Sequence, residues 1–229
     1  MVACCRNPDG ASGLQDFMSQ ISPSERSRIY LVQLDLEQQE TIERAGEYIR
    51  QNFDRVDVLL NVAGLLGDGS TTPGPERSIL KMDRDWIEKS MAINVIGPVI
   101  LSKELVPHMK TKNSKDGRPI SIIANLSARV GSIADNEIGG WYSYRFSKAA
   151  LNQATRTMAH ELKRQGTWSV ALHPGTTDTD LSLPFQKNVA GGRLFPVDFT
   201  AKRLLDVVDS MKDVHSGGLF DWAGKALPF

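Results

Sequence analysis

The chain has 229 residues, of which 41% are hydrophobic and 24% charged, the balance of a globular protein large enough to bury a proper core. Lysine plus arginine and aspartate plus glutamate both number 27, so no net charge recruits nucleic acid or an anionic membrane. No apolar run approaches the roughly 20 residues of a membrane span, and the only cysteines, Cys4 and Cys5, are adjacent, which excludes a disulfide framework and a zinc site.

The first half of the chain alternates short β-rich runs with helical patterns. Helices are expected at residues 14–21 and 40–53, where apolar side chains recur at helical spacing. A loop rich in Gly, Ser, Thr and Pro is expected at residues 67–75. Strands are expected at residues 2–5, 28–34 and 56–60, where short stretches of β-branched and other apolar residues are followed by polar or turn-forming residues.

The second half continues the alternation. Helices are expected at residues 86–109, where a break at Gly97-Pro98 is left open, from Tyr144 onward, and at 200–211. Strands are expected at residues 119–126, 168–172 and 218–221, the first so continuously apolar that both its faces should be covered. Strands separated by helices predict βαβ units, and so one α/β domain with a doubly wound parallel sheet.

In such a sheet, ligands bind beyond the carboxyl ends of the strands. The predicted ends are mostly polar or small, as expected where a polar ligand lies against the backbone; loops favour the same residue types, so this alone leaves both interpretations open. The residues at these ends are Arg6, Asp35, Asn61 to Gly64, Asn125 to Ser127, and His173 to Thr179.

Tyr144 and Lys148 are four residues apart at the start of a predicted helix, so their polar ends should point at the same spot. A neighbouring ammonium ion favours the charged phenol, and we expect the pKa of Tyr144 to fall from its usual value of about 10. Such a pair can act as a general acid and base on an alcohol or a carbonyl. An ordinary surface pair on an amphipathic helix would have the same spacing.

Several motifs in the right order resemble the short-chain dehydrogenase/reductase family. Asn61-Val62-Ala63-Gly64 is similar to its Asn-Asn-Ala-Gly element, Asn94 to the Asn of its fourth long helix, and Tyr144 to Leu151 to its active-site helix. Pro174 to Thr179 resembles its Pro-Gly-x-x-x-Thr segment. Residues 131–133 and 139–145 resemble the C-factor-like and sniffer-like carbonyl reductases within the family. The resemblance implies a Rossmann-like fold.

The resemblance also implies a role for each matched residue. Tyr144 would give a proton to a carbonyl oxygen as hydride arrives, Lys148 would hold the nicotinamide ribose, and Asn94 would anchor a water. Arg6 would favour a ribose 2′-phosphate and so NADP(H) over NAD, although it has the alternative of being a solvated charge. The positions that would contact the cofactor, besides Tyr144 and Lys148, are Arg6, Asp35, Asn61, Ala63, Gly64, Pro174, Gly175, Thr177 and Thr179.

The chain departs from the family at the catalytic serine, usually the second Ser of Asn-x-Ser-Ser. Here the run is Asn125-Leu126-Ser127-Ala128. We take Ser127 as the catalytic serine, with Ser132 as a substitute. Because the position is shifted by one, its side chain can turn to the other face of the strand end.

A larger departure is the absence of the family's Thr-Gly-x-x-x-Gly-x-Gly turn, whose glycines let a helix N-terminus meet the cofactor pyrophosphate. The chain resembles a shortened form that begins at the family's second strand, lacking about 30 residues, a strand and its helix. That strand lies centrally in the family's sheet, so its loss would leave an unpaired ladder unless the first two strands reattach elsewhere. The expectation is one Rossmann-type domain over residues 1–229, incomplete at the N-terminus.

The resemblance therefore implies an NADP(H)-dependent oxidoreductase that interconverts a carbonyl and an alcohol, with no metal. The alternative is a non-catalytic binding or regulatory protein, or an inactive shortened form, because the glycine-rich turn is absent. Expected partners are a small carbonyl or alcohol substrate and further copies of the chain, as a homodimer or homotetramer. Trp86, Ile100 and Leu105 are candidate interface residues, although core packing is the commoner fate of such side chains. The expected compartment is the cytoplasm, with an organelle left open.

Overall fold

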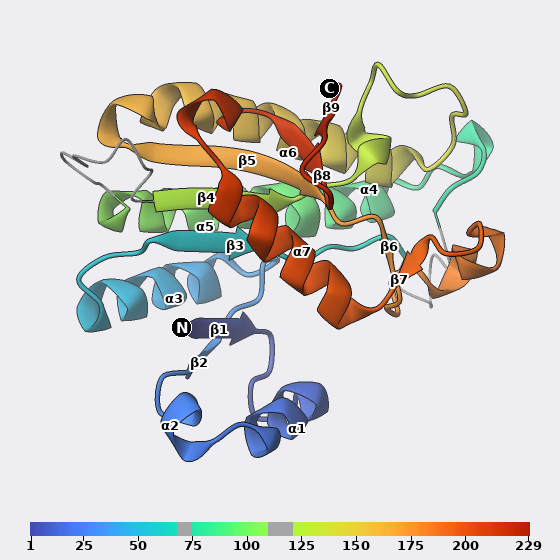
Figure 1. Ribbon diagram of the computed structural model, residues 1–229. Coiled ribbons are helices and arrows are strands. Elements are labelled where there is room, and N and C mark those ends of the chain that lie inside the picture. The colour runs from blue at the N-terminus through green and yellow to red at the C-terminus, as the bar shows by residue number, and fades with distance from the viewer. Residues whose placement is uncertain (68–74, 110–120) are drawn as a thin grey trace.

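The computed structural model describes residues 1–67, 75–109 and 121–229. It is a layered α/β structure: α7 crosses one face of a parallel sheet, while α5 and α6 lie behind the opposite face (Figure 1). The strands are β1 Val2–Cys5, β2 Tyr30–Gln33, β3 Val58–Asn61, β4 Ser121–Leu126, β5 Thr167–His173, β6 Thr176–Thr177, β7 Leu194–Phe195, β8 Leu219–Asp221 and β9 Ala226–Leu227. The helices are α1 Ser12–Gln20, α2 Pro23–Arg26, α3 Gln39–Asn52, α4 Arg84–Met91, α5 Gly97–Leu105, α6 Tyr142–Leu162 and α7 Val197–Ser210.

The predicted fold class is confirmed, and the expected strands and helices are present with ends shifted by a few residues. Three short strands, β6, β7 and β9, and the single-turn helix α2 were not predicted, because they carry too few residues to show a period. The expected loop falls largely on residues 68–74, outside the described residues, as do the first two residues of the strand predicted at 119–126.

The long helix predicted over residues 86–109 is divided. A π-helical turn at Ala92–Ile96 separates α4 from α5, which begins at Gly97 and Pro98. Pro98 has no backbone N–H, so it suits the first turn of a new helix segment. Gly97 permits a close approach, because a Cβ there would lie 2.5 Å from the Cβ of Leu36.

The sheet is split into separate pieces. β1 pairs in parallel with β2 alone, while β3, β4, β5, β8 and β9 form a second sheet in that order. Figure 1 shows β1 below β3, both arrows pointing the same way. Within the described residues no strand joins the two sheets, so β1 and β3 each keep an open edge. The predicted unpaired ladder is confirmed, and the first two strands do not reattach elsewhere.

Apolar side chains cover both faces of the larger sheet. One core lies between the sheet and helices α3 and α5, and Leu59, Ile123 and Leu101 belong to it. The other lies under α7 and includes Ile122, Val170 and Val207. Successive residues of β4, Ile122 and Ile123, enter opposite cores, as the two-residue period of a strand requires.

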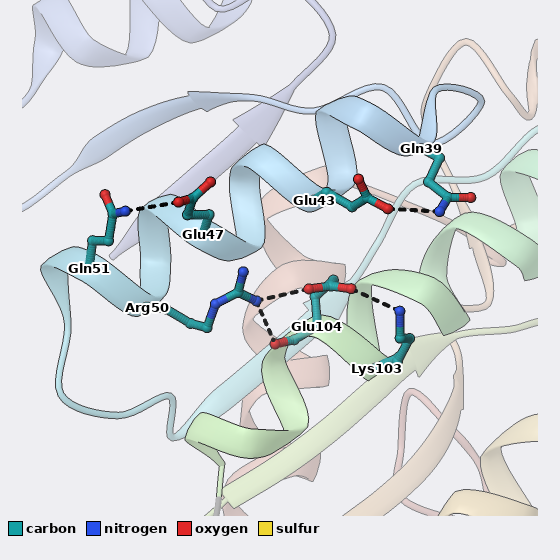
Figure 2. Close-up of polar contacts among 7 residues, drawn as sticks. All are labelled: Gln39, Glu43, Glu47, Arg50, Gln51, Lys103 and Glu104. Atoms are coloured by element: carbon teal, nitrogen blue, oxygen red, sulfur yellow. Dashed lines mark hydrogen bonds and ion pairs between the residues drawn. The ribbon is translucent and has the colours of Figure 1, made fainter.

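Helices α3 and α5 are held together by a close contact and an ion pair. A Cβ on Gly46 would lie 2.8 Å from Glu104 Cβ, so the helices approach as closely as they do because Gly46 has no side chain. Arg50 Nη1 donates to Glu104 Oε2 over 2.8 Å, and Lys103 Nζ donates to Glu104 Oε1 over 3.1 Å (Figure 2). The bond from Arg50, and then that from Lys103, lowers the pKa of Glu104.

Two of the three candidate interface residues are core residues instead. Trp86 and Leu105 are buried, and Ile100 packs against the core under α3 and α5. Burial inside the chain leaves Trp86 and Leu105 no surface for a second copy, so for these two the alternative of core packing holds and the interface assignment does not. No helix in the described ranges is long and apolar enough to cross a membrane.

Candidate active site

The first turns of α6 bring Tyr144 and Lys148 together at the carboxyl end of β4. Lys148 Nζ lies 5.6 Å from the centroid of the Tyr144 ring and donates a hydrogen bond to the Leu126 carbonyl oxygen over 2.7 Å. Both side chains are buried. Among the described residues, none bonds to the Tyr144 hydroxyl. The arrangement leaves one phenol and one ammonium group beside each other at the tip of a strand.

Burial, and not the contact between the two side chains, sets the direction of the pKa shifts of Tyr144 and Lys148. Desolvation raises the pKa of Tyr144 above its usual value and lowers the pKa of Lys148 to about 8. The expectation that the pKa of Tyr144 falls was therefore wrong, because loss of solvent disfavours the phenolate more than the neighbouring ammonium favours it. At neutral pH the Tyr144 hydroxyl keeps its proton and can donate it.

Asn94 fastens the loop after β3 to the site. Its side chain accepts from the Leu65 backbone N–H over 2.7 Å and donates to the Leu65 carbonyl oxygen over 2.8 Å. The same amide donates to Ser147 Oγ on α6 over 3.0 Å and to Ser90 Oγ over 3.2 Å. Asn94 lies fully buried in the π-helical turn, a local widening that often occurs at functional sites.

The loop fastened by Asn94 is open to solvent where it passes Lys148. Ala63 and Gly64 are exposed. A Cβ on Gly64 would lie 3.6 Å from both Asn94 Oδ1 and Lys148 Nζ. A side chain at position 64 would therefore occupy the space in front of the ammonium group.

Asn61, predicted to contact a cofactor, lies in a buried hydrogen-bond network. Its amide donates to Asn125 Oδ1 over 2.8 Å and to Ser102 Oγ over 3.3 Å. Asn125 in turn donates to Thr155 Oγ1 on α6 over 2.9 Å. These bonds join β3, β4, α5 and α6 just below the site, so the polar side chains at these strand ends hold the scaffold in register.

The serine predicted as catalytic bonds to α6 and is not part of the apolar cluster around Tyr144. Ser127 Oγ donates to Asn152 Oδ1 over 2.6 Å, whereas its neighbour Ala128 belongs to the apolar cluster of Tyr144 and Leu66. Ser132, the substitute, is buried and accepts from the Asp135 backbone N–H. The hydroxyl of Ser127 is thus used in a bond to Asn152, and its catalytic role stays a prediction.

Glu76 contacts the start of α6 next to Tyr144, a contact that the sequence did not reveal. Its carboxylate accepts hydrogen bonds from the backbone N–H and the hydroxyl of Ser143, the residue before Tyr144. Its carbonyl oxygen accepts from the Trp141 N–H over 2.5 Å. A buried carboxylate at a helix N-terminus satisfies free N–H groups and is favoured by the helix dipole. Glu76 and Ser143 are 67 positions apart in the sequence, so no local pattern reveals this contact.

Aromatic rings form an apolar wall beside Tyr144. Trp141 adopts a left-handed backbone conformation, with φ of 56°, which is strained for a residue with a Cβ. Its ring lies 6.4 Å from the Tyr144 ring and 5.2 Å from the Phe185 ring, measured between centroids. The rings of Trp141 and Phe185 make the surroundings of the Tyr144 ring apolar.

The segment after β5 passes near α7 and is held there. Gly175 has φ of +75°, and a Cβ on it would lie 2.7 Å from the Phe195 ring, so this turn requires glycine. The hydroxyls of Thr177 and Thr200 are 3.0 Å apart, and Ser182 Oγ donates to the Thr177 carbonyl oxygen. Thr179 and Pro174 are at least partly exposed beside it.

The remaining predicted residues lie at the ends of β1 and β2. Arg6 is exposed, and its carbonyl oxygen accepts from Gln33 Nε2 over 3.2 Å. The Asp35 carboxylate accepts from the Glu37 N–H and from Gln38 Nε2. Asp35 thus stabilises its own turn before α3 (Asx-turn geometry), which is a structural use of the side chain.

The chain is similar to known proteins over most of its length. A family model described as short chain dehydrogenase matches residues 2–190. The C-signal protein of Myxococcus xanthus is 32% identical over 174 residues, 76% of this chain and 93% of that protein. An NADPH-bound carbonyl reductase from chicken fatty liver has a TM-score of 0.84 at 27% identity, and the carbonyl reductase Sniffer of D. melanogaster, which shows the fold alone, 0.85 at 24%. Each match spans 100% of this chain and 87% of that structure.

Proposed function

Since the chain belongs to the short-chain dehydrogenase family and is therefore an oxidoreductase, we propose that it interconverts a carbonyl and an alcohol with NADP(H), using Tyr144 as acid and base. The observation that carries the proposal is the convergence of Tyr144, Lys148 and Gly64 at one strand tip. The chicken reductase, similar over the whole chain, was solved with NADPH bound, which supports this cofactor.

The space in front of Lys148 suits the nicotinamide end of the cofactor. Gly64 leaves that space free, and the Lys148 ammonium can donate to a ribose hydroxyl there. Pro174, Gly175, Thr177 and Thr179 would line the nicotinamide and the diphosphate from the other side. When bound, NADP(H) supplies or accepts the hydride.

Tyr144 supplies the proton. In reduction the carbonyl carbon gains the hydride with its electron pair, and the carbonyl oxygen gains the Tyr144 proton, which yields the alcohol; oxidation reverses both transfers. The raised pKa of Tyr144 supports a hydroxyl that is protonated at neutral pH, the form that donates the proton in reduction. Asn94 and Lys148 would return a proton to Tyr144 through water.

The wall of Trp141 and Phe185 supports carbonyl substrates with an apolar or aromatic substituent. Such a group would be buried against the two rings with its oxygen at Tyr144. Ala128 contributes a methyl group, not a hydroxyl, to the same cluster, so Tyr144 would polarise the carbonyl without help from a serine.

The test is NADPH oxidation by the purified chain with a panel of aryl and alkyl ketones and aldehydes. Tyr144→Phe should lower kcat by about 10²-fold or more while NADPH binding persists. The matched control is Tyr142→Phe, two residues earlier on α6, where the ring contacts Phe146 and kcat should stay unchanged. Full reductase activity in Tyr144→Phe would remove the proposal.

Cofactor preference has its own test. If Arg6 binds a ribose 2′-phosphate, Arg6→Ala should lower kcat/KM with NADPH by about tenfold, while kcat/KM with NADH stays unchanged. An unchanged ratio of kcat/KM with NADPH to kcat/KM with NADH would show that Arg6 is only a solvated charge.

A non-catalytic binding role is the second candidate, favoured by the open edges of β1 and β3. Within the described residues no strand lies between them, and so no glycine-rich turn leads from such a strand to a helix N-terminus. The backbone N–H groups that would bind the pyrophosphate of a dinucleotide are therefore not found at this position in the described residues. Calorimetric titration with NADPH separates the two candidates: saturable binding by the wild-type chain argues for the enzyme, and its absence for the binding protein.

A further inference from the structure

The backbone just before α6 makes a left-handed turn. Gly139, Gly140 and Trp141 are consecutive and have φ values of 72°, 68° and 56°. Glycine adopts this conformation readily, whereas a residue with a Cβ does so at a steric cost. Such a conformation persists only where the surrounding contacts hold it. The contacts of this turn therefore decide where the Trp141 ring lies.

Arg145, in the first turns of α6, supplies three of these contacts. Its Nε donates to the Gly140 carbonyl oxygen over 3.0 Å, and its Nη2 donates to the Gly139 carbonyl oxygen over 3.3 Å. Its Nη1 donates to the Val130 carbonyl oxygen, on the loop after β4, over 3.0 Å. A guanidinium presents its donors in a fixed planar fork, so one side chain can bind several oxygens around it. The turn and the loop are thus fastened to the helix that carries Tyr144.

Both segments that Arg145 binds belong to the apolar cluster around Tyr144. Val130 packs against that cluster from the loop after β4, and Trp141 and Phe185 pack against it from their own segments. The Trp141 carbonyl oxygen also accepts from the Arg145 backbone N–H over 2.8 Å. The side chain of Arg145 adds a second attachment to this backbone bond, and the second attachment is the one that a substitution can remove.

We propose that Arg145 is a positioning residue that sets which carbonyl substrates the site prefers, because it holds the Trp141 ring beside Tyr144. This inference deepens the proposed function and rests on it. With the turn held, an aryl substituent packs against a fixed ring. Without the three bonds the Trp141 ring is no longer fixed, and the aryl group loses that contact. A small substrate that does not reach Trp141 loses nothing by this change.

The experiment compares NADPH-dependent reduction of benzaldehyde and acetaldehyde by the full chain. Arg145→Met should lower the ratio of kcat/KM for benzaldehyde to kcat/KM for acetaldehyde at least about tenfold, chiefly through a higher KM for benzaldehyde. Arg145→Lys should restore only part of the ratio, because an ammonium group lacks the planar fork. The matched control is Arg156→Met, an exposed arginine on α6 that lies 5.5 Å from the Phe229 ring and should leave the ratio unchanged. An unchanged ratio in Arg145→Met, or an equal loss on both substrates, overturns the proposal.

A double-mutant cycle tests whether Arg145 acts through Trp141. Trp141→Ala should lower the same ratio by a similar factor. In the Trp141→Ala background, Arg145→Met should change the ratio further by less than about twofold. Effects of the two substitutions that multiply in full would show that Arg145 acts by another route, which overturns the proposal.

Hydrogen exchange separates this proposal from the proposed function. Amides of residues 139–141 should exchange at least about tenfold faster in Arg145→Met than in the wild-type chain, whether or not the chain is active. Unchanged exchange there in a chain that reduces both aldehydes would overturn the role of Arg145 alone. A wild-type chain that reduces neither aldehyde would overturn the proposed function and the preference with it, even where faster exchange shows that Arg145 holds the turn.

Discussion

The Lys148 ammonium group donates a hydrogen bond to the Leu126 carbonyl oxygen over 2.7 Å, which ties the start of α6 to the last residue of β4. Because the side chain is otherwise buried, this one bond replaces only part of the lost hydration. The bond holds Lys148 beside Tyr144. Because the ammonium group is buried there, its pKa is lowered to about 8.

This burial predicts how stability changes with pH. A lysine whose folded pKa lies below its unfolded value binds fewer protons in the folded state, so the free energy of unfolding should rise between pH 8 and pH 10.5. The rise should reach about 3 kcal/mol across that window in the wild-type chain. Urea unfolding at pH 7, 8, 9 and 10 would measure it; parallel slopes for wild type and Lys148→Met would contradict the assignment to Lys148.

Glu76 is predicted to position Tyr144 without touching the substrate. Glu76→Ala removes the acceptor for the Ser143 N–H and hydroxyl, and should lower kcat about tenfold or more with KM for NADPH unchanged. Glu76→Gln keeps an acceptor oxygen and should restore most of kcat. Glu137→Gln, at an exposed carboxylate, is the matched control. Equal activity of Glu76→Ala and wild type would show that the contact has no catalytic effect.

Substitutions at Ala128 and Ser127 test which of these two positions can hold a catalytic hydroxyl. Ala128→Ser places a hydroxyl in the cluster around Tyr144, where a second hydrogen bond to the developing oxyanion should raise kcat by about five- to tenfold. Ser127→Ala should leave kcat unchanged and lower stability by about 1 kcal/mol through loss of the bond to Asn152. Steady-state kinetics and thermal unfolding measure the two effects, and a large kcat loss in Ser127→Ala would reinstate that serine.

The ion pair between α3 and α5 predicts an acid-labile contact. The folded pKa of Glu104 is depressed, chiefly by Arg50, so its stabilisation is present above its usual pKa of about 4.5 and is lost as pH falls through the folded value. Arg50→Met should cost about 1 kcal/mol at pH 7 and reduce the loss of stability on acidification. Arg84→Met breaks only an exposed pair with Glu88 and should change little. Identical acid unfolding of wild type and Arg50→Met would refute the role.

The sequence by itself determined what depends on local spacing. Alternating strand and helix patterns predicted the α/β layers, and the four-residue spacing of Tyr144 and Lys148 placed both on one side of α6, because helix geometry is local. The absence of the family's glycine-rich turn led to the expectation of an unpaired ladder, and within the described residues no strand joins β1 to β3.

Only the tertiary structure decided what depends on burial and on distant neighbours. Desolvation sets the direction of the Tyr144 pKa, and it follows from how much protein surrounds the ring. Asn61 bonds to Asn125 on the next strand, and Glu76 reaches Ser143 from a distant loop. Such contacts join residues far apart in the chain, so no pattern along the sequence carries them.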